Sequence, residues 1–497
     1  MTLIRNPKFM IGGLLCALVF AALLGLRIGL VNLPLEHGGS SARAVLTAPG
    51  DAERWMKILQ DDRHIGYAHS QLVRENAGYR LKEDLYLRLN TMGLVQDLRL
   101  NYDGQLDDTM ALAAFRFDMQ SGRFSVGIEG QMEGDWLICR IDSGGTGKTA
   151  RLRFDSPPFL PAGIFPATAA AGLVPDQTYR YPIFDPATMA RGEVSVTVIG
   201  REPIVIGKET LTATRVELVY KGLHQQAWID DDGTVLMEKG LLGLQQIRST
   251  REEALQPLTL TASADLTRMA AVTPDRPIAD ARRQKWLKLR LDGVGPDRLP
   301  ASDNRQVRNG RELLIRLEPL PEDRASLTLT GDFQPYLLPS PLVQADDPRI
   351  QRLAAELAAQ ANTPRAKIEA IMDWMDTNIE KRPVLSLPDA LNTLAERMGD
   401  CNEHAVLLAA LARAAGIPAQ IEAGLVYLKG RFYYHAWNRV YLGQWITVDA
   451  LMGQMPADAT HIRLARGDLS EQMDILPMIG RLNITILGSE IASQPHD

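Results

Sequence analysis

Cysteine is scarce in this chain, and its scarcity excludes a fold held together by disulfides. The 497 residues contain three cysteines, Cys16, Cys139 and Cys401. Cys16 lies in an apolar N-terminal segment, so only two cysteines remain outside it. If Cys401 stays a free thiol, no intramolecular structural disulfide can form. A reactive thiol exported to an oxidising compartment then needs burial or a reducing partner to stay reduced.

The chain also lacks a strong net charge, long runs of one sign, internal repeats and low-complexity tracts. Its formal net charge is −6 at pH 7, which argues against nucleic acid as the main partner. Its apolar and charged fractions, 45% and 23%, are those of an ordinary globular protein. At this length we expect a multidomain protein, with roughly two to four domains.

One long apolar run is present, at the N-terminus. Arg5 and Lys8 precede the apolar residues 9–26, a stretch long for a signal-peptide core and short for a membrane span. No small-x-small cleavage site follows it, so we expect an uncleaved signal anchor over residues 1–30. The positive charges keep this end cytoplasmic, which predicts a single-pass protein of the inner (cytoplasmic) membrane with the remainder on the periplasmic side. Residues 31–50 are predicted to be a flexible tether.

Residues 51–255 are predicted to form a β-rich antiparallel domain, either one large sheet or a half-open barrel. Alternating segments are separated by glycine, aspartate and asparagine throughout this region. No catalytic constellation stands in it. Its apolar concave face could bind a substrate or a lipid, although core packing explains the same residues. The clearest strand patterns are Tyr79–Leu89, Gln96–Tyr102, Ala114–Met119, Phe124–Glu129, Trp136–Ile141, Thr212–Tyr220 and Gln226–Ile229.

Two further regions complete the predicted organisation. Residues 256–338 are expected to be a small β domain or a connector, and residues 339–497 an α+β domain with helices first and an antiparallel sheet after them. The short strands expected in the connector are Trp286–Leu291, Glu312–Leu317 and Ser326–Thr330. Helices are expected from Asp347-Pro348 to about Ala361, from Thr363-Pro364 to about Lys381, and from Pro388 to Arg397.

Cys401 stands at the beginning of the next predicted helix. Asp400 is a good N-cap, and Glu403 follows it at the spacing of a capping box. The apolar residues 405–415 continue the helix, which predicts Cys401 as its first residue. At this position the helix dipole and the free amides stabilise a thiolate, and the same amides can bind a developing oxyanion.

His435 and Asp449 lie on two strands predicted to pair as a hairpin. Residues 431–440 and 444–449 have strand patterns and are separated by a three-residue loop that ends in Gly443. This loop length predicts that His435 lies directly opposite Asp449, with the two side chains on one face. A cysteine, a histidine and an aspartate in this arrangement are what thiol catalysis requires.

With these motifs, residues from about 340 to 470 resemble the transglutaminase-like superfamily of papain-type cysteine enzymes, in a bacterial envelope form. The resemblance implies that Cys401 is the nucleophile, His435 the general base and acid, and Asp449 the carboxylate that orients the histidine. Many members have other residues where this chain has Arg439 and Ala450, which bears on the substrate more than on the chemistry. The matching motifs are Gly399-Asp400-Cys401, Arg413-Ala-Ala-Gly-Ile-Pro418, Tyr434-His435-Ala436-Trp437 and Trp445-Ile-Thr-Val-Asp449.

Nearby residues have less specific interpretations. Cys401, His404, His435 and Asp449 are all residue types that bind zinc, but Cys-x-x-His lacks the paired motifs of zinc sites, so we expect no metal and no cofactor. His404 is expected to pack or hydrogen-bond near the site. The aromatic neighbours Tyr434 and Trp437 either line the cleft or pack in the core.

The predicted function is that of a membrane-anchored, exported thiol enzyme. It would cleave or transfer acyl groups at amide or peptide bonds through a thioester, either as a peptidase or amidase, or as an acyltransferase of transglutaminase type. Protein or peptide substrates of the cell envelope are the expected partners, and the sequence leaves the acyl acceptor and the oligomeric state open. The alternative is a non-catalytic envelope module that uses the same fold as a binding scaffold.

Overall fold

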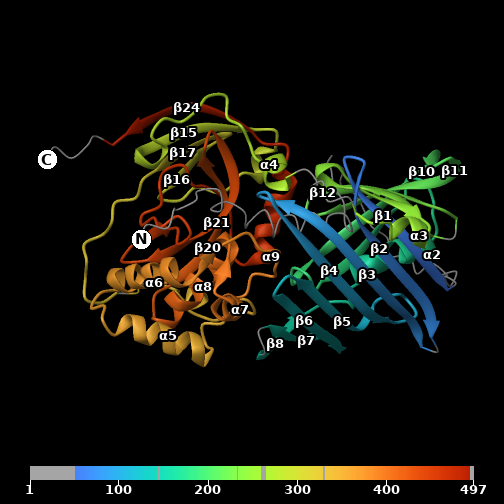
Figure 1. Ribbon diagram of the computed structural model, residues 1–497, viewed down its shortest axis with the longest axis horizontal. Helices are drawn as coiled ribbons and strands as arrows, with labels where there is room; N and C mark the ends of the chain where they lie inside the picture. Colours follow the sequence, from blue (N-terminus) through green and yellow to red (C-terminus); the bar gives the residue numbers. More distant parts are fainter. Residues whose placement is uncertain are drawn as a thin grey trace. The chain divides into compact units, whose positions relative to one another are not determined.

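A computed structural model describes residues 51–492, except 76, 144–145, 232, 259–264, 328 and 330 (Figure 1). The predicted anchor, residues 1–30, and the predicted tether, residues 31–50, lie outside the described residues. Within the described part, no helix is both long and apolar enough to cross a membrane. The described chain divides into two compact units: one contains the residues up to Asp265 together with Leu385–Leu387, and the other contains Leu266–Val384 and the residues from Pro388 on.

The first unit is built on one 14-stranded antiparallel sheet, which confirms the predicted β-rich region. Its strand order is β8 to β1 followed directly by β14 to β9, so β1 pairs with β14 and the edges are β8 and β9. The first eight strands are β1 (Ala52–Gln60), β2 (Arg63–Glu75), β3 (Gly78–Thr91), β4 (Leu94–Leu106), β5 (Leu112–Ser121), β6 (Phe124–Glu133), β7 (Trp136–Ser143) and β8 (Thr146–Arg153). The others are β9 (Thr178–Asp185), β10 (Ala190–Ile206), β11 (Glu209–Tyr220), β12 (Leu223–Ile229), β13 (Val235–Lys239) and β14 (Leu244–Ser249).

Side-chain alternation explains why these segments form strands with one buried face. In β5, Phe115, Phe117 and Met119 are buried, whereas Arg116 between them is exposed. Every second residue therefore contributes to the core, as a period of two requires. The helical segments of this unit are short: η2 (Pro161–Gly163), α2 (Ile164–Ala171), η3 (Leu241–Gly243) and α3 (Arg251–Ala254).

The second unit contains a four-stranded antiparallel sheet that joins distant parts of the chain. Its order is β16 (Gln306–Asn309), β17 (Glu312–Arg316), β15 (Gln284–Asp292) and β24 (Asn483–Ile491). Two of the strands expected in the connector are confirmed as β15 and β17. The third prediction, a strand at 326–330, is wrong. The structure describes residues 326, 327 and 329 of this segment, and all three lie outside strands. Leu329 is 39% exposed, so this apolar alternation has no buried face to fill.

Two of the three helices predicted before Cys401 begin where the sequence predicts, and the third begins two residues later. Asp347, Thr363 and Asp389 are the N-caps of α5 (Pro348–Ala358), α6 (Pro364–Asn378) and α7 (Ala390–Glu396), and each side chain accepts a backbone N–H of its helix. The third helix starts at Ala390 rather than Pro388, because Asp389 is the residue that caps it. The short helical segments of this unit are α4 (Leu266–Ala270), η4 (Ala281–Arg283), η5 (Pro296–Arg298), η6 (Gln334–Tyr336), α9 (Leu469–Gln472) and η7 (Met473–Met478).

A central helix and a second four-stranded sheet position the site residues. Helix α8 (Cys401–Ala414) packs on β20 (Ala419–Leu428) and β21 (Arg431–Tyr441), and α5, α6 and α7 pack around it (Figure 1). The antiparallel strand order is β22 (Trp445–Val448), β21, β20 and β23 (Ile462–Arg466). The two-residue strand β19 (Met398–Gly399) lies just before α8 in the sequence, and it pairs in parallel with β18 (Glu380–Lys381). Helices packed on an antiparallel sheet make the α+β architecture expected here.

Candidate active site

The start of α8 holds Cys401 in a fully formed capping box. The Asp400 carboxylate accepts the backbone N–H of Asn402 at 3.1 Å, and Glu403 Oε2 accepts the backbone N–H of Asp400 at 3.0 Å. Burial, together with the neighbouring Glu403 carboxylate, raises the pKa of Asp400 well above its ordinary range. Cys401 is the first residue of the helix, as the sequence predicts, and is 0% exposed. Its sulfur therefore lies where the helix dipole favours negative charge.

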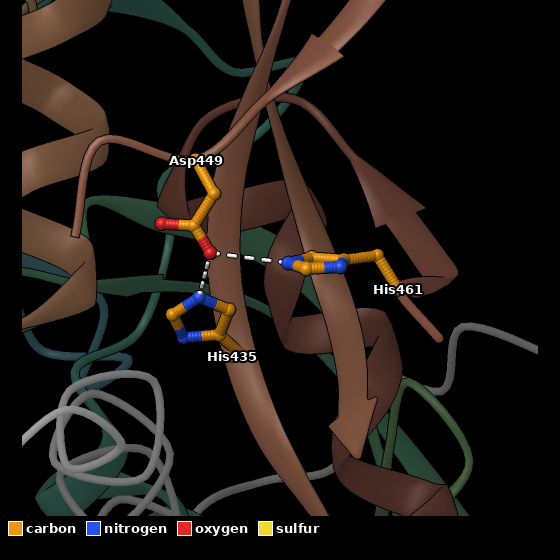
Figure 2. A group of neighbouring side chains, drawn as sticks. All are labelled: His435, Asp449 and His461. Atoms are coloured by element: carbon orange, nitrogen blue, oxygen red, sulfur yellow. Dashed lines mark hydrogen bonds and ion pairs between the residues drawn. The ribbon is translucent and has the colours of Figure 1, made fainter. Parts of the chain in front are cut away.

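His435, on β21, is bound to Asp449 in the interior of the unit. His435 Nε2 lies 2.6 Å from Asp449 Oδ2, and both side chains are buried (Figure 2). Burial alone would raise the pKa of Asp449, but the adjacent His435 and His461 outweigh it and hold that pKa far below the ordinary range. The carboxylate is thus ionised and can only accept, so the proton of a neutral His435 ring sits on Nε2.

The tautomer of His435 leaves its other nitrogen available as a base. Nδ1 carries a lone pair in this tautomer, and it has no hydrogen-bond partner within the part of the chain that the structure describes. A histidine held in one tautomer by a buried carboxylate, with the opposite nitrogen open, has the organisation of a general base.

The register that brings His435 to Asp449 differs from the predicted one. Tyr441 pairs with Trp445, so the three-residue loop of the hairpin is 442–444 and not 441–443. The rings of Tyr441 and Trp445 lie 5.6 Å apart, and this aromatic pair is lost in the predicted register. The correction moves β22 by two residues against β21. Because a shift of two preserves the face, His435 and Asp449 still lie on the same side, as diagonal rather than direct neighbours.

His461, which the sequence did not single out, completes the group. It immediately precedes β23, and its Nε2 lies 3.1 Å from the same Asp449 Oδ2 that His435 binds (Figure 2). Its Nδ1 lies 3.2 Å from the backbone oxygen of Asp458 and 3.4 Å from Asp458 Oδ1. Burial alone would lower the pKa of His461, but Asp458 and Asp449 outweigh it and raise this pKa to about 9. Nothing local in Asp458-Ala-Thr-His461 distinguishes it from an ordinary loop, so only the tertiary structure reveals it.

The three residues proposed as neighbours of the site are all buried. His404 Nδ1 lies 2.7 Å from the backbone oxygen of Asp400, and burial lowers the pKa of His404 to about 4, so its ring is neutral. The ring centroid of Trp437 lies 5.9 Å from that of His435, and Trp437 Nε1 donates to Glu422 Oε2 at 2.9 Å. Tyr434 is one residue from His435 on β21, so its side chain points to the other face of the sheet. Both aromatic residues have the burial of core residues.

A metal site is the other chemistry that this group suggests. Ligand atoms of His435, Asp449 and His461 lie within 4.8 Å of one another. However, both histidine contacts to Asp449 are hydrogen bonds, at 2.6 and 3.1 Å. We therefore interpret the three residues as a hydrogen-bonded chain. The zinc set considered from sequence, which included Cys401 and His404, is not the one that the fold assembles.

A cysteine at a helix start with a histidine–aspartate pair on an adjacent antiparallel sheet defines the class of papain-like thiol-enzyme folds. Residues 351–450 match the family model of the transglutaminase-like superfamily, which confirms the resemblance drawn from the motifs. Cys401, His435 and Asp449 all lie within the matched segment. The match supports a transglutaminase-like fold for this part of the chain.

Solved structures similar to parts of the chain have low identities and low TM-scores. A candidate cysteine protease from Cytophaga hutchinsonii is 20% identical over 43% of this chain and 92% of its own, with a TM-score of 0.29. The periplasmic domain of TgpA from Pseudomonas aeruginosa, bound to ethylmercury, is 18% identical over 37% of this chain and 92% of its own, with a TM-score of 0.25. A β-barrel-like protein from Brucella abortus, which represents a domain of unknown function, is 10% identical over 42% of this chain and 97% of its own, with a TM-score of 0.33. The sequence search among curated proteins found no match.

Proposed function

We propose that this chain is a thiol enzyme that cleaves or transfers acyl groups at amide or peptide bonds, with Cys401, His435 and Asp449 as its triad. The observation that carries the proposal is the 2.6 Å contact between His435 and Asp449, with the opposite ring nitrogen open. The position of Cys401 at the first turn of α8 supports it, and so does the family match over 351–450.

In the proposed reaction, His435 Nδ1 takes the thiol proton of Cys401, and the sulfur attacks the carbonyl carbon of the substrate. The carbonyl oxygen becomes an oxyanion, which the positive end of the α8 helix dipole stabilises. His435 then gives its proton to the leaving amine as the carbon–nitrogen bond breaks, and a thioester remains on Cys401. Water or a second amine attacks the thioester and loses a proton to His435. The carbon–sulfur bond then breaks, the acyl product leaves, and His435 returns the proton to the Cys401 sulfur. Asp449 stabilises the imidazolium at each step.

We also propose that the enzyme works in the cell envelope, anchored by its N-terminal segment, on protein or peptide substrates. The apolar residues 9–26, which follow Arg5 and Lys8 in the sequence, support this location. Water is the favoured acyl acceptor, because transfer to an amine in water needs a site that holds the amine and excludes solvent.

One observation favours the alternative of a non-catalytic envelope module. Cys401, His435 and Asp449 are 0%, 0% and 1% exposed, so a substrate needs a rearrangement to reach the sulfur. A scaffold without activity would tolerate this burial. The two functions differ in what they require of the thiol, because only an enzyme needs Cys401 ionised at neutral pH.

The deciding experiment is the pH dependence of Cys401 alkylation in the full chain, measured by peptide mapping after reaction with iodoacetamide. An ordinary thiol has a pKa of about 8.5, whereas a thiolate paired with histidine forms several units lower. We expect alkylation of the wild type to remain fast below pH ~7 and to lose this property in His435→Ala and Asp449→Asn. Cys139 is an internal control, since burial raises its pKa to about 12. An ordinary profile for Cys401 in all three proteins would overturn the proposed triad and favour the binding module.

A further inference from the structure

We propose that His461, with Asp458 behind it, is a positioning residue that fixes the Asp449 carboxylate and weakens the hold of Asp449 on the His435 proton. This inference rests on the proposed function, since it concerns how the His435–Asp449 pair is tuned. It extends the triad to a chain that runs from Asp458 through His461 and Asp449 to His435.

The contacts of His461 require its charged form. Each ring nitrogen faces an oxygen: Nε2 faces Asp449 Oδ2, and Nδ1 faces the backbone and carboxylate oxygens of Asp458. A neutral imidazole has one N–H, so one of its two sides would place a lone pair against an acceptor. The imidazolium donates from both nitrogens and satisfies both sides. The pKa of His461, raised to about 9 by the two carboxylates, agrees with this geometry.

Asp458 is itself held rigidly enough to orient His461. Its Oδ1 accepts the backbone N–H of Thr460 at 2.9 Å and the Thr460 hydroxyl at 2.5 Å, and its Oδ2 accepts from Gln454 Nε2 at 2.9 Å. Its backbone oxygen accepts from Arg305 Nη2 at 2.6 Å. Burial alone would raise the pKa of Asp458, but His461 and these donors hold it well below the ordinary range. The acceptor on the far side of His461 is therefore fixed and negative.

Asp449 has no freedom to rotate once His461 is bound. Its Oδ1 accepts the backbone N–H of Met452 at 2.9 Å, and its Oδ2 accepts from both histidines. Trp437 packs edge-on against His461, with the ring centroids 5.1 Å apart at 88°, and also contacts His435. The carboxylate plane is thus set by donors from three segments of the chain. The Oδ2 atom is held at the position that His435 needs.

The charges of the hydrogen-bonded groups predict in which direction His461 changes the affinity of His435 for its proton. With Asp458 and Asp449 ionised and His461 protonated, the three groups carry one net negative charge, which the imidazolium of His435 can neutralise. A neutral residue at position 461 removes a positive charge whose ring centre lies 5.9 Å from that of His435. His435 would then hold its proton more tightly. The other nearby ring, His404, is neutral and adds no charge, because burial lowers its pKa to about 4.

The test is the alkaline limb of Cys401 alkylation in the full chain, where the thiolate–imidazolium pair loses the His435 proton. His461→Gln keeps a hydrogen-bond donor for Asp449 but carries no charge. We expect its alkaline inflection to move up by about one pH unit, while the fast reaction near neutral pH remains. Asp458→Asn lets His461 lose its proton at lower pH, so this variant should move the alkaline inflection in the same direction by a smaller amount. It replaces His461→Gln as the test if His461→Gln does not fold.

His64→Gln is the matched control, since His64 is a half-buried histidine of the other unit. We expect it to leave the profile of Cys401 unchanged. An unchanged inflection in both His461→Gln and Asp458→Asn, with a low-pH thiolate that still depends on His435, overturns the inference and leaves the proposed function standing. If the wild type shows no low-pH thiolate, the proposed function fails, and the inference fails with it because no activated pair exists to be tuned.

Discussion

Gly399 and Glu403 lie in direct contact at the beginning of α8. A Cβ atom on residue 399 would lie 2.3 Å from Glu403 Cβ and 2.8 Å from Glu403 Cγ, closer than real Cβ contacts allow. Glu403 in turn binds the backbone N–H of Asp400, one residue before Cys401. The absence of a side chain at position 399 is therefore what permits the capping box at the start of the Cys401 helix.

We expect Gly399→Ala to displace Glu403 and to lower the free energy of unfolding by about 2 kcal/mol, through loss of the cap and overpacking. The fast alkylation of Cys401 at neutral pH should decline with it, because the first turn of the helix loses its order. Urea unfolding and peptide-mapped alkylation measure the two effects. Gly127→Ala is the control, since its added Cβ meets only Asp118 Oδ1, at an ordinary 3.4 Å. Equal stability of the two variants would contradict this prediction.

His404 is the second buried histidine near Cys401, and we expect it to take no part in proton transfer. Its Nδ1–H donates to the backbone oxygen of Asp400, and burial lowers its pKa to about 4, so its ring does not titrate near neutral pH. His404→Gln should leave both inflections of the Cys401 alkylation profile in place and cost about 1 kcal/mol of stability for the lost hydrogen bond. Loss of the low-pH thiolate in this variant would show instead that His404 is the base.

The stability of the protein should depend on pH through His461. Its pKa is raised to about 9 in the folded state, above the 6.5 of an unfolded histidine. The folded state therefore holds this proton more tightly, and the stabilisation is fully present below pH ~6.5 and lost as the pH rises through about 9. We expect the free energy of unfolding to fall by about 3 kcal/mol across this window in the wild type. Urea unfolding as a function of pH measures it, and a wild type that shows the same pH dependence as His461→Gln would rule this out.

Glu422 is expected to be a stabilising residue behind the site. It is 3% exposed, its Oε2 accepts the indole N–H of Trp437, and its Oε1 accepts from Arg466 at 2.6 and 2.9 Å. Glu422→Ala leaves the indole and part of the guanidinium without their acceptor, which should cost about 3 kcal/mol.

An exposed ion pair serves as the control for Glu422. Glu193 binds Arg180 at 2.7 Å, and both side chains are more than half exposed. Glu193→Ala should change the free energy of unfolding by less than about 1 kcal/mol. Chemical unfolding of the two variants beside the wild type gives the comparison. Similar losses in both would mean that burial does not set the contribution of Glu422.

The local elements of the site were predictable because short-range rules decide them. Asp347-Pro348 and Thr363-Pro364 predict helix starts, and both helices begin there. The spacing of Asp400 and Glu403 predicts the capping box, and hence the place of Cys401 as first helical residue. Each of these structures is formed by residues within one helical turn, so the sequence contains all of its partners.

The hairpin shows where local rules stop. Loop length and Gly443 predict a three-residue turn, and that length is right, but the pairing of Tyr441 with Trp445 selects a loop one residue further along. The prediction that His435 and Asp449 share a face survives only because the error is an even number of residues. Register depends on which side chains pack best across the sheet, and this is a tertiary quantity.

By itself, the sequence determined the class of the domain, the antiparallel character of the region before it, the helix that presents Cys401, and the face on which His435 and Asp449 meet. Only the tertiary structure decided that His461 binds the same carboxylate oxygen as His435, and that β24 pairs with β15 almost two hundred residues earlier. The reason is physical. Caps and alternation are set by neighbours in the chain, whereas the partners of a buried charge are whatever the folded core brings beside it, at any separation in sequence.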